Sequence, residues 1–278
     1  MGSSYSLPYC KIVGNGPGPA PALDQLGTPF VRFNLALSEK LLEQEIRICN
    51  RKQAGQPDSP FPFLVNSLSF PFVWCEQLQH RLAESAIALE RMLSCRPTAG
   101  LVTTHAMLQM GGALQLYRMP LRPRMLRAAN MPARQPLAAA YHNWMGERRL
   151  ALQWVKTHET QLEWTGLQLA LPLADTSDKP IANPYPALLR CFESSTCTPS
   201  DSTADTLRQM ATVQPLAWCL HANYAELNAL ETCFYLDRDS AITPNWWLYH
   251  NSLSLSIDRL MLRLMQAQQY LVAQQELG

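Results

Sequence analysis

The sequence predicts an all-α protein: a multi-helix bundle with long helices, Pro-rich linkers and a flexible N-terminal tail. Apolar residues recur at helical spacing through several long segments, and the turn signals of β-hairpins are missing. Hydrophobic residues make up 47% of the 278 residues and charged residues only 16%. This balance is enough to fill a core and excludes global disorder.

The first helices are predicted between proline- and glycine-rich breaks. A helix over 30–53 is expected to stop before Gly55, and a second over 71–94 to stop before Pro97. We expect a broken helix over 100–117, interrupted at its Gly-Gly pair, and irregular structure over 119–136, which holds four prolines. A long helix follows over 136–168.

The second half of the chain is also predicted to be helical. A linker over 172–186 precedes a short helix over 186–193, and a polar Ser/Thr stretch over 194–206 leads to a helix over 215–236. The last helix, 244–275, is expected to begin at the N-cap Thr243. Its near-heptad apolar run is typical of a helix packed in a bundle or against a partner.

The sequence is therefore predicted to form three regions: a flexible tail over 1–28, a helical domain over 29–170 with an Arg-rich segment over 118–149, and an acidic helical region over 171–278.

No signal peptide is visible, and none of the eight cysteines form Cys-x-x-Cys. We therefore expect reduced cysteines and a cytoplasmic location. The charge-free run 97–117 is too polar for a transmembrane helix, so no membrane contact is predicted.

The sequence lacks the common catalytic motifs. The segment Gly14–Gly18 looks superficially like a phosphate loop, but it has no lysine and its proline removes one backbone N–H. The six histidines are scattered singly, so no metal site is predicted. We expect a non-enzymatic protein without cofactors, although a helical enzyme with a site assembled from scattered residues stays open.

The net charge of +1 hides an uneven distribution. Residues 96–158 hold nine basic residues and one acidic residue, for a net +8, whereas residues 159–278 hold six basic and thirteen acidic residues, for a net −7. Arginine binds phosphate and carboxylate through paired hydrogen bonds, and flanking aromatic rings can stack on bases. The predicted nucleic-acid or acidic-tail site comprises Arg118, Arg122, Arg124, Arg127, Arg134, Arg148 and Arg149, with Tyr117, Tyr141 and Trp144 for stacking.

Two other interpretations of these arginines stay open. They could pair with the acidic C-terminal third inside the same fold, because the opposite charges nearly match. They could also form a merely solvated loop. Sequence-specific binding of double-stranded DNA is disfavoured, since the protein sequence shows neither helix-turn-helix spacing nor a zinc-finger pattern.

A local pattern resembles a known family. His142-Asn-Trp-Met-Gly-Glu-Arg-Arg-Leu150, together with Pro71-Phe-Val-Trp74 and the helix after it, is similar to the PriC-type primosomal replication proteins. The resemblance covers residues 30–165; one extra residue separates the aromatic residue from the glutamate, and residues 170–278 have no counterpart. It implies a non-catalytic role in replication restart, binding single-stranded DNA and the acidic tail of single-stranded-DNA-binding protein. Arg148 and Arg149 would match the acidic-tail site.

The sequence thus favours a helical protein that binds single-stranded nucleic acid or an acidic protein tail, with a place in DNA replication restart. The alternative is a structural or adaptor subunit of a bacterial, phage or mobile-element assembly. In that alternative the helix over 244–275 makes protein contacts or self-associates, and the Trp246-Trp247 pair is expected to be exposed.

Overall fold

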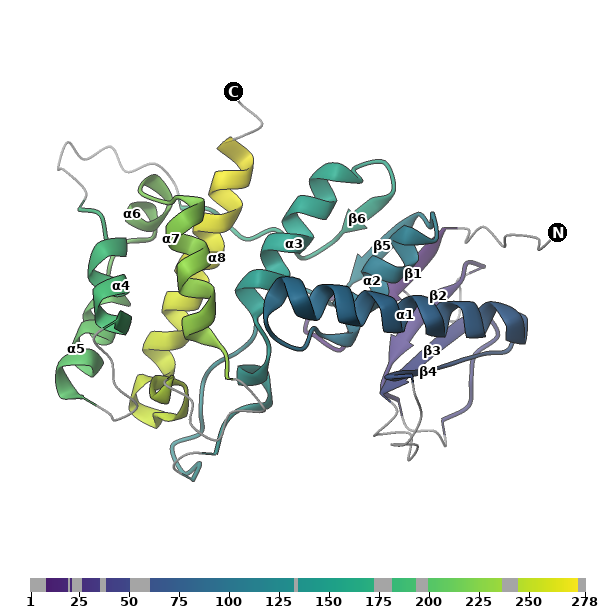
Figure 1. The fold of residues 1–278 in the computed structure, drawn as a ribbon, viewed down its shortest axis with the longest axis horizontal. Helices are drawn as coiled ribbons and strands as arrows, with labels where there is room; N and C mark the ends of the chain where they lie inside the picture. The colour runs from purple at the N-terminus through teal and green to yellow at the C-terminus, as the bar shows by residue number, and fades with distance from the viewer. Residues whose placement is uncertain are drawn as a thin grey trace. The chain divides into compact units, whose positions relative to one another are not determined.

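The computed structural model describes residues 9–19, 21, 27–35, 39–50, 61–132, 135–172, 182–193, 200–236 and 245–274. The chain divides into two compact units (Figure 1). Unit 1 comprises Met1–Pro120 and Gln153–Leu167, and unit 2 comprises Leu121–Leu152 and Gln168–Gly278. Helix α3 (Trp144–Thr157) begins in unit 2 and ends in unit 1.

Unit 1 is built on a six-stranded mixed sheet with the order β4-β3-β2-β1-β5-β6. All neighbouring strands pair in parallel except β3 and β4. The strands are β1 (Cys10–Val13), β2 (Phe30–Phe33), β3 (Glu45–Asn50), β4 (Phe63–Ser67), β5 (Leu114–Tyr117) and β6 (Leu162–Trp164). The protein is therefore α/β, and the prediction of an all-α helical bundle is wrong.

The largest error was the helix predicted over 30–53, where β2 and β3 lie. β3 is buried on both faces: Ile46 and Ile48 point to one, Glu45 and Arg47 to the other. Such a strand does not show the alternation that marks a half-buried strand. The apparent helical spacing arose from combining two short strands into one segment.

Other predicted elements are divided in the structure. The central strand β1 lies within the segment predicted to be a flexible tail. The long helix over 136–168 is instead α3 followed by β6, and the broken helix over 100–117 is α2 (Ala99–Gln109) followed by β5. The helix over 71–94 is confirmed as α1 (Phe72–Leu93).

One face of the sheet is apolar. The paired positions Ile12, Val31 and Ile46 are fully buried there. α1 and α2 pack against each other and contact β4 and β5 respectively, and their buried sides supply mainly leucines to the core. α2 begins at Thr98, whose hydroxyl accepts a hydrogen bond from the N–H of Leu101 at 3.3 Å.

Unit 2 is helical where it is described. Its helices are α4 (Tyr185–Glu193), α5 (Asp201–Met210), α6 (Pro215–Leu220), α7 (Tyr224–Glu231) and α8 (Ser254–Gln274), with short 3-10 turns η2 (Ala138–Tyr141), η3 (Thr232–Phe234), η4 (Trp246–Tyr249) and η5 (Asn251–Leu253). Trp246 and Trp247 are buried in its hydrophobic core, so the expected exposure of this pair is wrong. The predicted cap Thr243 lies outside the described residues.

Candidate functional site

The ends of three neighbouring parallel strands form one edge of the sheet in unit 1. β1 lies between β2 and β5, and the three run in the same direction. The residues that follow Val13, Phe33 and Tyr117 therefore meet at the carboxyl edge of the sheet. The strand order reverses at β1, because the chain proceeds from β1 to one side and later returns as β5 on the other. Ligands of open α/β sheets bind outside this point.

The loops after β1 and β5 are joined by backbone hydrogen bonds. The N–H of Gly14 donates to the carbonyl of Tyr117 at 2.9 Å, and the N–H of Gly16 donates to the carbonyl of Arg118 at 3.0 Å. Arg118 Nε donates in return to the Gly16 carbonyl at 2.7 Å. These two glycine N–H groups are thus engaged by the protein itself.

The close approach explains why glycine occupies both positions. A Cβ atom on Gly14 or on Gly16 would lie 2.6 Å from the carbonyl oxygen of Arg118. A contact that short with backbone forces the chain to move. The glycines therefore allow the loops after β1 and β5 to touch.

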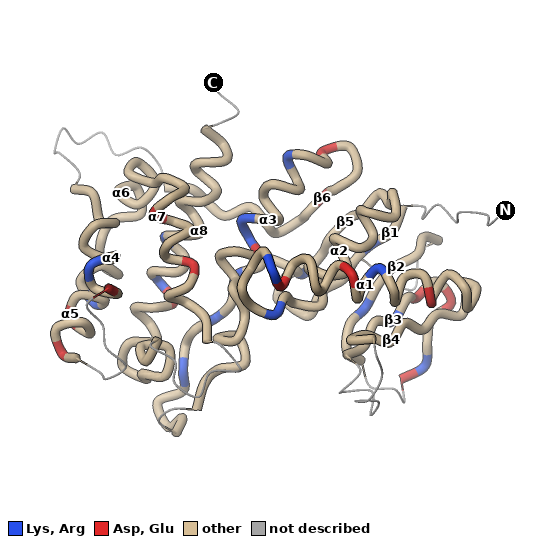
Figure 2. The backbone as a smooth tube through the Cα atoms, in the orientation of Figure 1, with Lys and Arg blue, Asp and Glu red and all other residues tan. Residues whose placement is uncertain are grey.

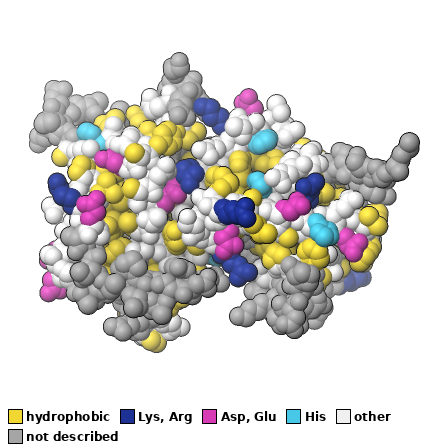
Figure 3. Space-filling model, viewed as in Figure 1, with side chains coloured by type: hydrophobic (Ala, Val, Ile, Leu, Met, Phe, Trp, Pro, Cys, Tyr) yellow, Lys and Arg dark blue, Asp and Glu magenta, His cyan; other side chains and the backbone are white. Residues whose placement is uncertain are grey.

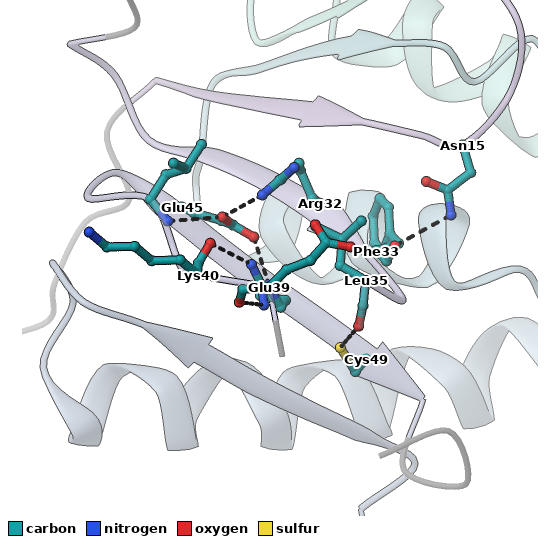
Figure 4. A network of polar contacts seen from close by, with 10 residues as sticks. Asn15, Arg32, Phe33, Leu35, Glu39, Lys40, Glu45 and Cys49 are labelled. Atoms are coloured by element: carbon teal, nitrogen blue, oxygen red, sulfur yellow. Dashed lines mark hydrogen bonds and ion pairs between the residues drawn. The ribbon is translucent and has the colours of Figure 1, made fainter. Parts of the chain in front are cut away.

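Asparagine side chains line the edge over β1, β2 and β3. Asn15 Nδ2 donates to the Phe33 carbonyl at 3.4 Å (Figure 4). Asn34 follows β2, and its Oδ1 accepts the N–H of Asn50 at 3.0 Å. Within the described part of the chain, Asn15 Oδ1 and Asn34 Nδ2 have no hydrogen-bond partner, so both are available to a ligand.

Strained backbone occurs in the same loops. Asn34 and Arg118 have φ angles of 54° and 52°. A left-handed conformation costs a residue such as arginine about 1–2 kcal/mol, whereas asparagine adopts it more readily. Such strain is often concentrated at ligand sites, and Arg118 directly follows β5.

The N-terminus of α2 also lies at this edge, beside the loop after β5. A Cβ on Gly100 would lie 2.5 Å from Cε of Met119, so the first turn of α2 touches that loop. The turn carries no acidic residue. Its positive helix end and the Arg118 guanidinium both favour an anion.

A buried ionic network supports the neighbouring strands. The Glu45 carboxylate accepts hydrogen bonds from Arg32 Nη2 and Arg47 Nε, both at 2.8 Å, and from the N–H of Leu42 at 3.1 Å (Figure 4). Arg47 also donates to the Glu39 carbonyl at 2.7 Å. Burial raises the pKa of Glu45, but these hydrogen bonds outweigh it and hold that pKa below its ordinary value. The network fixes the loop that enters β3.

The arginines predicted from sequence belong to both units. Figure 2 shows basic and acidic positions interspersed, and Figure 3 shows the same mixing on one face. Arg118 belongs to unit 1, whereas Arg122, Arg124 and Arg127 belong to unit 2. Arg134 lies outside the described residues.

Arg127 is used to hold its own loop. Its Nε donates to Asn251 Oδ1 at 2.6 Å, and its terminal nitrogens donate to the carbonyls of Pro132, at 3.0 Å, and Gln135. Asn251 Nδ2 in turn donates to the carbonyl of Met131 at 2.9 Å. The Arg-rich segment is therefore fastened to η5 of unit 2 at this point.

Arg148 and Arg149 are held inside unit 2. Arg148 is fully buried and donates to Gln269 Oε1 at 2.9 Å; burial and the charge of Arg122 lower its pKa to about 10. Arg149 pairs with Glu231. In this structure neither guanidinium is presented as an open surface charge.

The predicted stacking residues belong to different units. Tyr117 is part of unit 1 and half-buried. Tyr141 and Trp144 pack against the core of unit 2, and Trp144 Nε1 donates to the Ala139 carbonyl at 2.7 Å.

Sequence reasoning rejected Gly14–Gly18 as a phosphate loop and did not single out Asn15 or Asn34. The available signal was the short run Cys-Lys-Ile-Val over Cys10–Val13 followed directly by Gly-Asn-Gly, which is typical of a strand ending at a ligand loop. Among the described residues, no group of histidines, cysteines and carboxylates is placed to hold a metal ion. None of the described helices is both long and apolar enough to cross a bilayer.

Comparisons with known proteins identify no relative. No protein-family model matches the chain, and neither the curated proteins nor the solved structures contain a match.

Proposed function

We propose that unit 1 binds a small phosphate-bearing molecule of the nucleotide class at the carboxyl edge of β1, β2 and β5. The observation that carries this proposal is the juxtaposition of Asn15, Asn34 and Arg118 where the strand order reverses.

The chemistry of the edge suits such a ligand. Arg118 uses Nε for Gly16, while its two terminal nitrogens have no hydrogen-bond partner among the described residues. They can donate to phosphate oxygens, aided by the positive N-terminus of α2. The free amide groups of Asn15 and Asn34 offer one acceptor and one donor, which suits a sugar hydroxyl or the polar edge of a base.

Calorimetric titration of the whole protein tests the proposal. The probes are inorganic phosphate, nucleoside mono-, di- and triphosphates, sugar phosphates and dinucleotides. We expect one nucleotide class to bind and Asn15→Asp to weaken it at least tenfold, because the new carboxylate repels phosphate. Gln161→Glu is the matched control: Gln161 is exposed just before β6, at the opposite edge of the sheet. Failure of every probe, or equal loss in both variants, rejects the proposal.

The nucleic-acid or acidic-tail function stays a second candidate through Arg122 and Arg124. Both are exposed, and neither forms an ion pair within the described residues. Arg122 also lies near enough to Arg148 to lower the pKa of that buried guanidinium. A labelled single-stranded oligonucleotide should bind at low salt, lose affinity as salt rises, and bind the Arg122→Gln/Arg124→Gln variant at least fivefold more weakly. Salt-independent or absent binding rejects this candidate.

A further inference from the structure

One stripe of helix α8 is only partly covered by the described residues of unit 2. Ten of its 21 residues are buried, whereas Leu255 is 47% exposed and Arg259 is also exposed. Leu255, Arg259 and Arg263 are spaced four residues apart, so they follow one another along the same side of the helix. The stripe combines an apolar side chain with two cations.

The two cations lack a carboxylate partner. In the described chain, Arg259 makes no hydrogen bond or ion pair, and Arg263 makes a single hydrogen bond, from Nη1 to Gln266 Oε1 at 3.3 Å. Arg263 Nε is buried without a partner there. The adjacent Asp258 is already engaged, because its Oδ1 accepts the N–H of Met125 at 2.7 Å.

This arrangement costs the free protein some stability. Like charges one turn apart destabilise a helix by about 0.2–0.5 kcal/mol. Burial and then the charge of Arg259 lower the pKa of Arg263. An anionic group between the two guanidinium groups would remove the repulsion and satisfy their free N–H donors.

A second exposed leucine lies close to the stripe. α6 packs against α8, and the charge of Arg263 acts on the thiol of Cys219 near the end of α6. The next residue, Leu220, is 51% exposed. We call Leu220, Leu255, Arg259 and Arg263 the α8 patch.

We propose that the α8 patch binds an acidic peptide segment of a partner protein, one that carries two carboxylates about one helical turn apart beside apolar side chains. The guanidinium groups rise from positions about 6 Å apart along the helix, a separation that carboxylates one turn apart on a peptide can match. Each guanidinium group can bind one carboxylate through two parallel hydrogen bonds. The exposed leucines favour a peptide with apolar residues over a nucleic-acid backbone, which carries no apolar side chains to pack against them.

Fluorescence anisotropy of the whole protein tests this proposal with three labelled probes. They are a synthetic peptide of glutamate and leucine at helical spacing, the same peptide with glutamine for glutamate, and a single-stranded oligonucleotide. We expect the acidic peptide to bind at low salt and the glutamine peptide to bind at least tenfold more weakly. The Arg259→Gln/Arg263→Gln variant should weaken the acidic peptide at least tenfold, and Leu255→Ser several-fold.

The matched control is Arg190→Gln, which removes an exposed arginine from α4 in the same unit and should leave peptide affinity unchanged. Circular dichroism and the melting temperature establish that each variant is folded. The proposal is overturned if the acidic peptide does not bind, if Arg190→Gln weakens it as much as the double variant, or if the oligonucleotide binds these arginines more tightly.

Discussion

Arg149 donates two hydrogen bonds to Glu231, from Nε to Oε1 at 2.7 Å and from Nη2 to Oε2 at 3.1 Å. Arg149 belongs to the basic middle of the sequence and Glu231 to its acidic last third. The hydrogen bond to Glu231 raises the pKa of Arg149, against the opposing effect of burial. The two charged regions therefore meet each other at this point, as one of the sequence interpretations allowed.

Breaking this pair should destabilise the protein. Glu231 is almost fully buried, and Arg149 keeps about a fifth of its side chain exposed. Glu231→Gln leaves a guanidinium partly buried without its counter-ion, and we expect a loss of about 1–3 kcal/mol in the free energy of unfolding. The Arg149→Met/Glu231→Leu double variant should lose less unfolding free energy than the single variants Arg149→Met and Glu231→Leu lose together.

Urea denaturation measures both effects. The control is Asp205→Asn, which breaks the exposed Arg208–Asp205 pair on α5 and should cost no more than about 0.5 kcal/mol. Strict additivity of the two single variants would contradict a direct interaction between Arg149 and Glu231.

Glu45 should make unit 1 sensitive to acid. Its hydrogen bonds hold its folded-state pKa below the ordinary 4.5, so the unfolded chain binds the proton more readily. The stabilisation is therefore present above pH 4.5 and is lost as the pH falls through the folded-state pKa. Glu45→Gln should cost about 3 kcal/mol at pH 7, because Arg32 and Arg47 lose their shared carboxylate.

Unfolding curves between pH 3 and pH 7 test this expectation, because the variant should lose part of the wild-type pH dependence. Glu84→Gln is the control, since Glu84 forms an exposed pair with Arg81. Equal pH dependence in wild type and Glu45→Gln would show that this network does not control acid stability.

The sequence predicted α1 well because α1 is a long surface helix with one apolar stripe, which gives a clear period of 3.6 residues. It failed for β1, β2 and β5, which have only four residues each. A four-residue strand covers too little sequence to separate a period of two from a helical period. The all-α error followed from these short elements.

The candidate site was missed for a related reason. Asn15, Asn34 and Arg118 are far apart in the sequence, and only the pairing of β1 with both β2 and β5 brings them to one edge. The arginine count over 118–149 describes an accumulation of charge in the sequence. It could not show that Arg127 and Arg148 are used inside the fold, because their partners Asn251 and Gln269 lie more than 100 residues away.

Two glycine substitutions should separate a backbone contact from a side-chain contact. In Gly14→Ala the new Cβ meets the Arg118 carbonyl oxygen at 2.6 Å as well as Met119, so we expect a loss of about 1–3 kcal/mol. In Gly100→Ala the new Cβ meets only the flexible end of Met119, at 2.5 Å from Cε. That variant should be milder, and Met119→Ala should relieve it.

Thermal and urea unfolding of the two alanine variants, each with and without Met119→Ala, give the comparison. The second substitution should remove most of the added cost of Gly100→Ala but only part of that of Gly14→Ala, because the contact with the Arg118 carbonyl oxygen remains. Complete relief in both backgrounds would mean that the Arg118 carbonyl moves aside without cost.

His105 should lower the stability of the protein in mild acid. Its ring stacks on Trp154 with the centroids 5.3 Å apart, and burial lowers its pKa from the ordinary 6.5. Between the folded-state pKa and 6.5 the unfolded chain binds more protons, so the free energy of unfolding falls as the pH drops.

Nuclear magnetic resonance titration should give a pKa below 6.5 for His105. His105→Phe keeps the aromatic contact with Trp154 and should reduce the loss of stability between pH 7 and pH 5. A titration midpoint at or above 6.5 would show that the ring is not desolvated by the contact between α2 and α3.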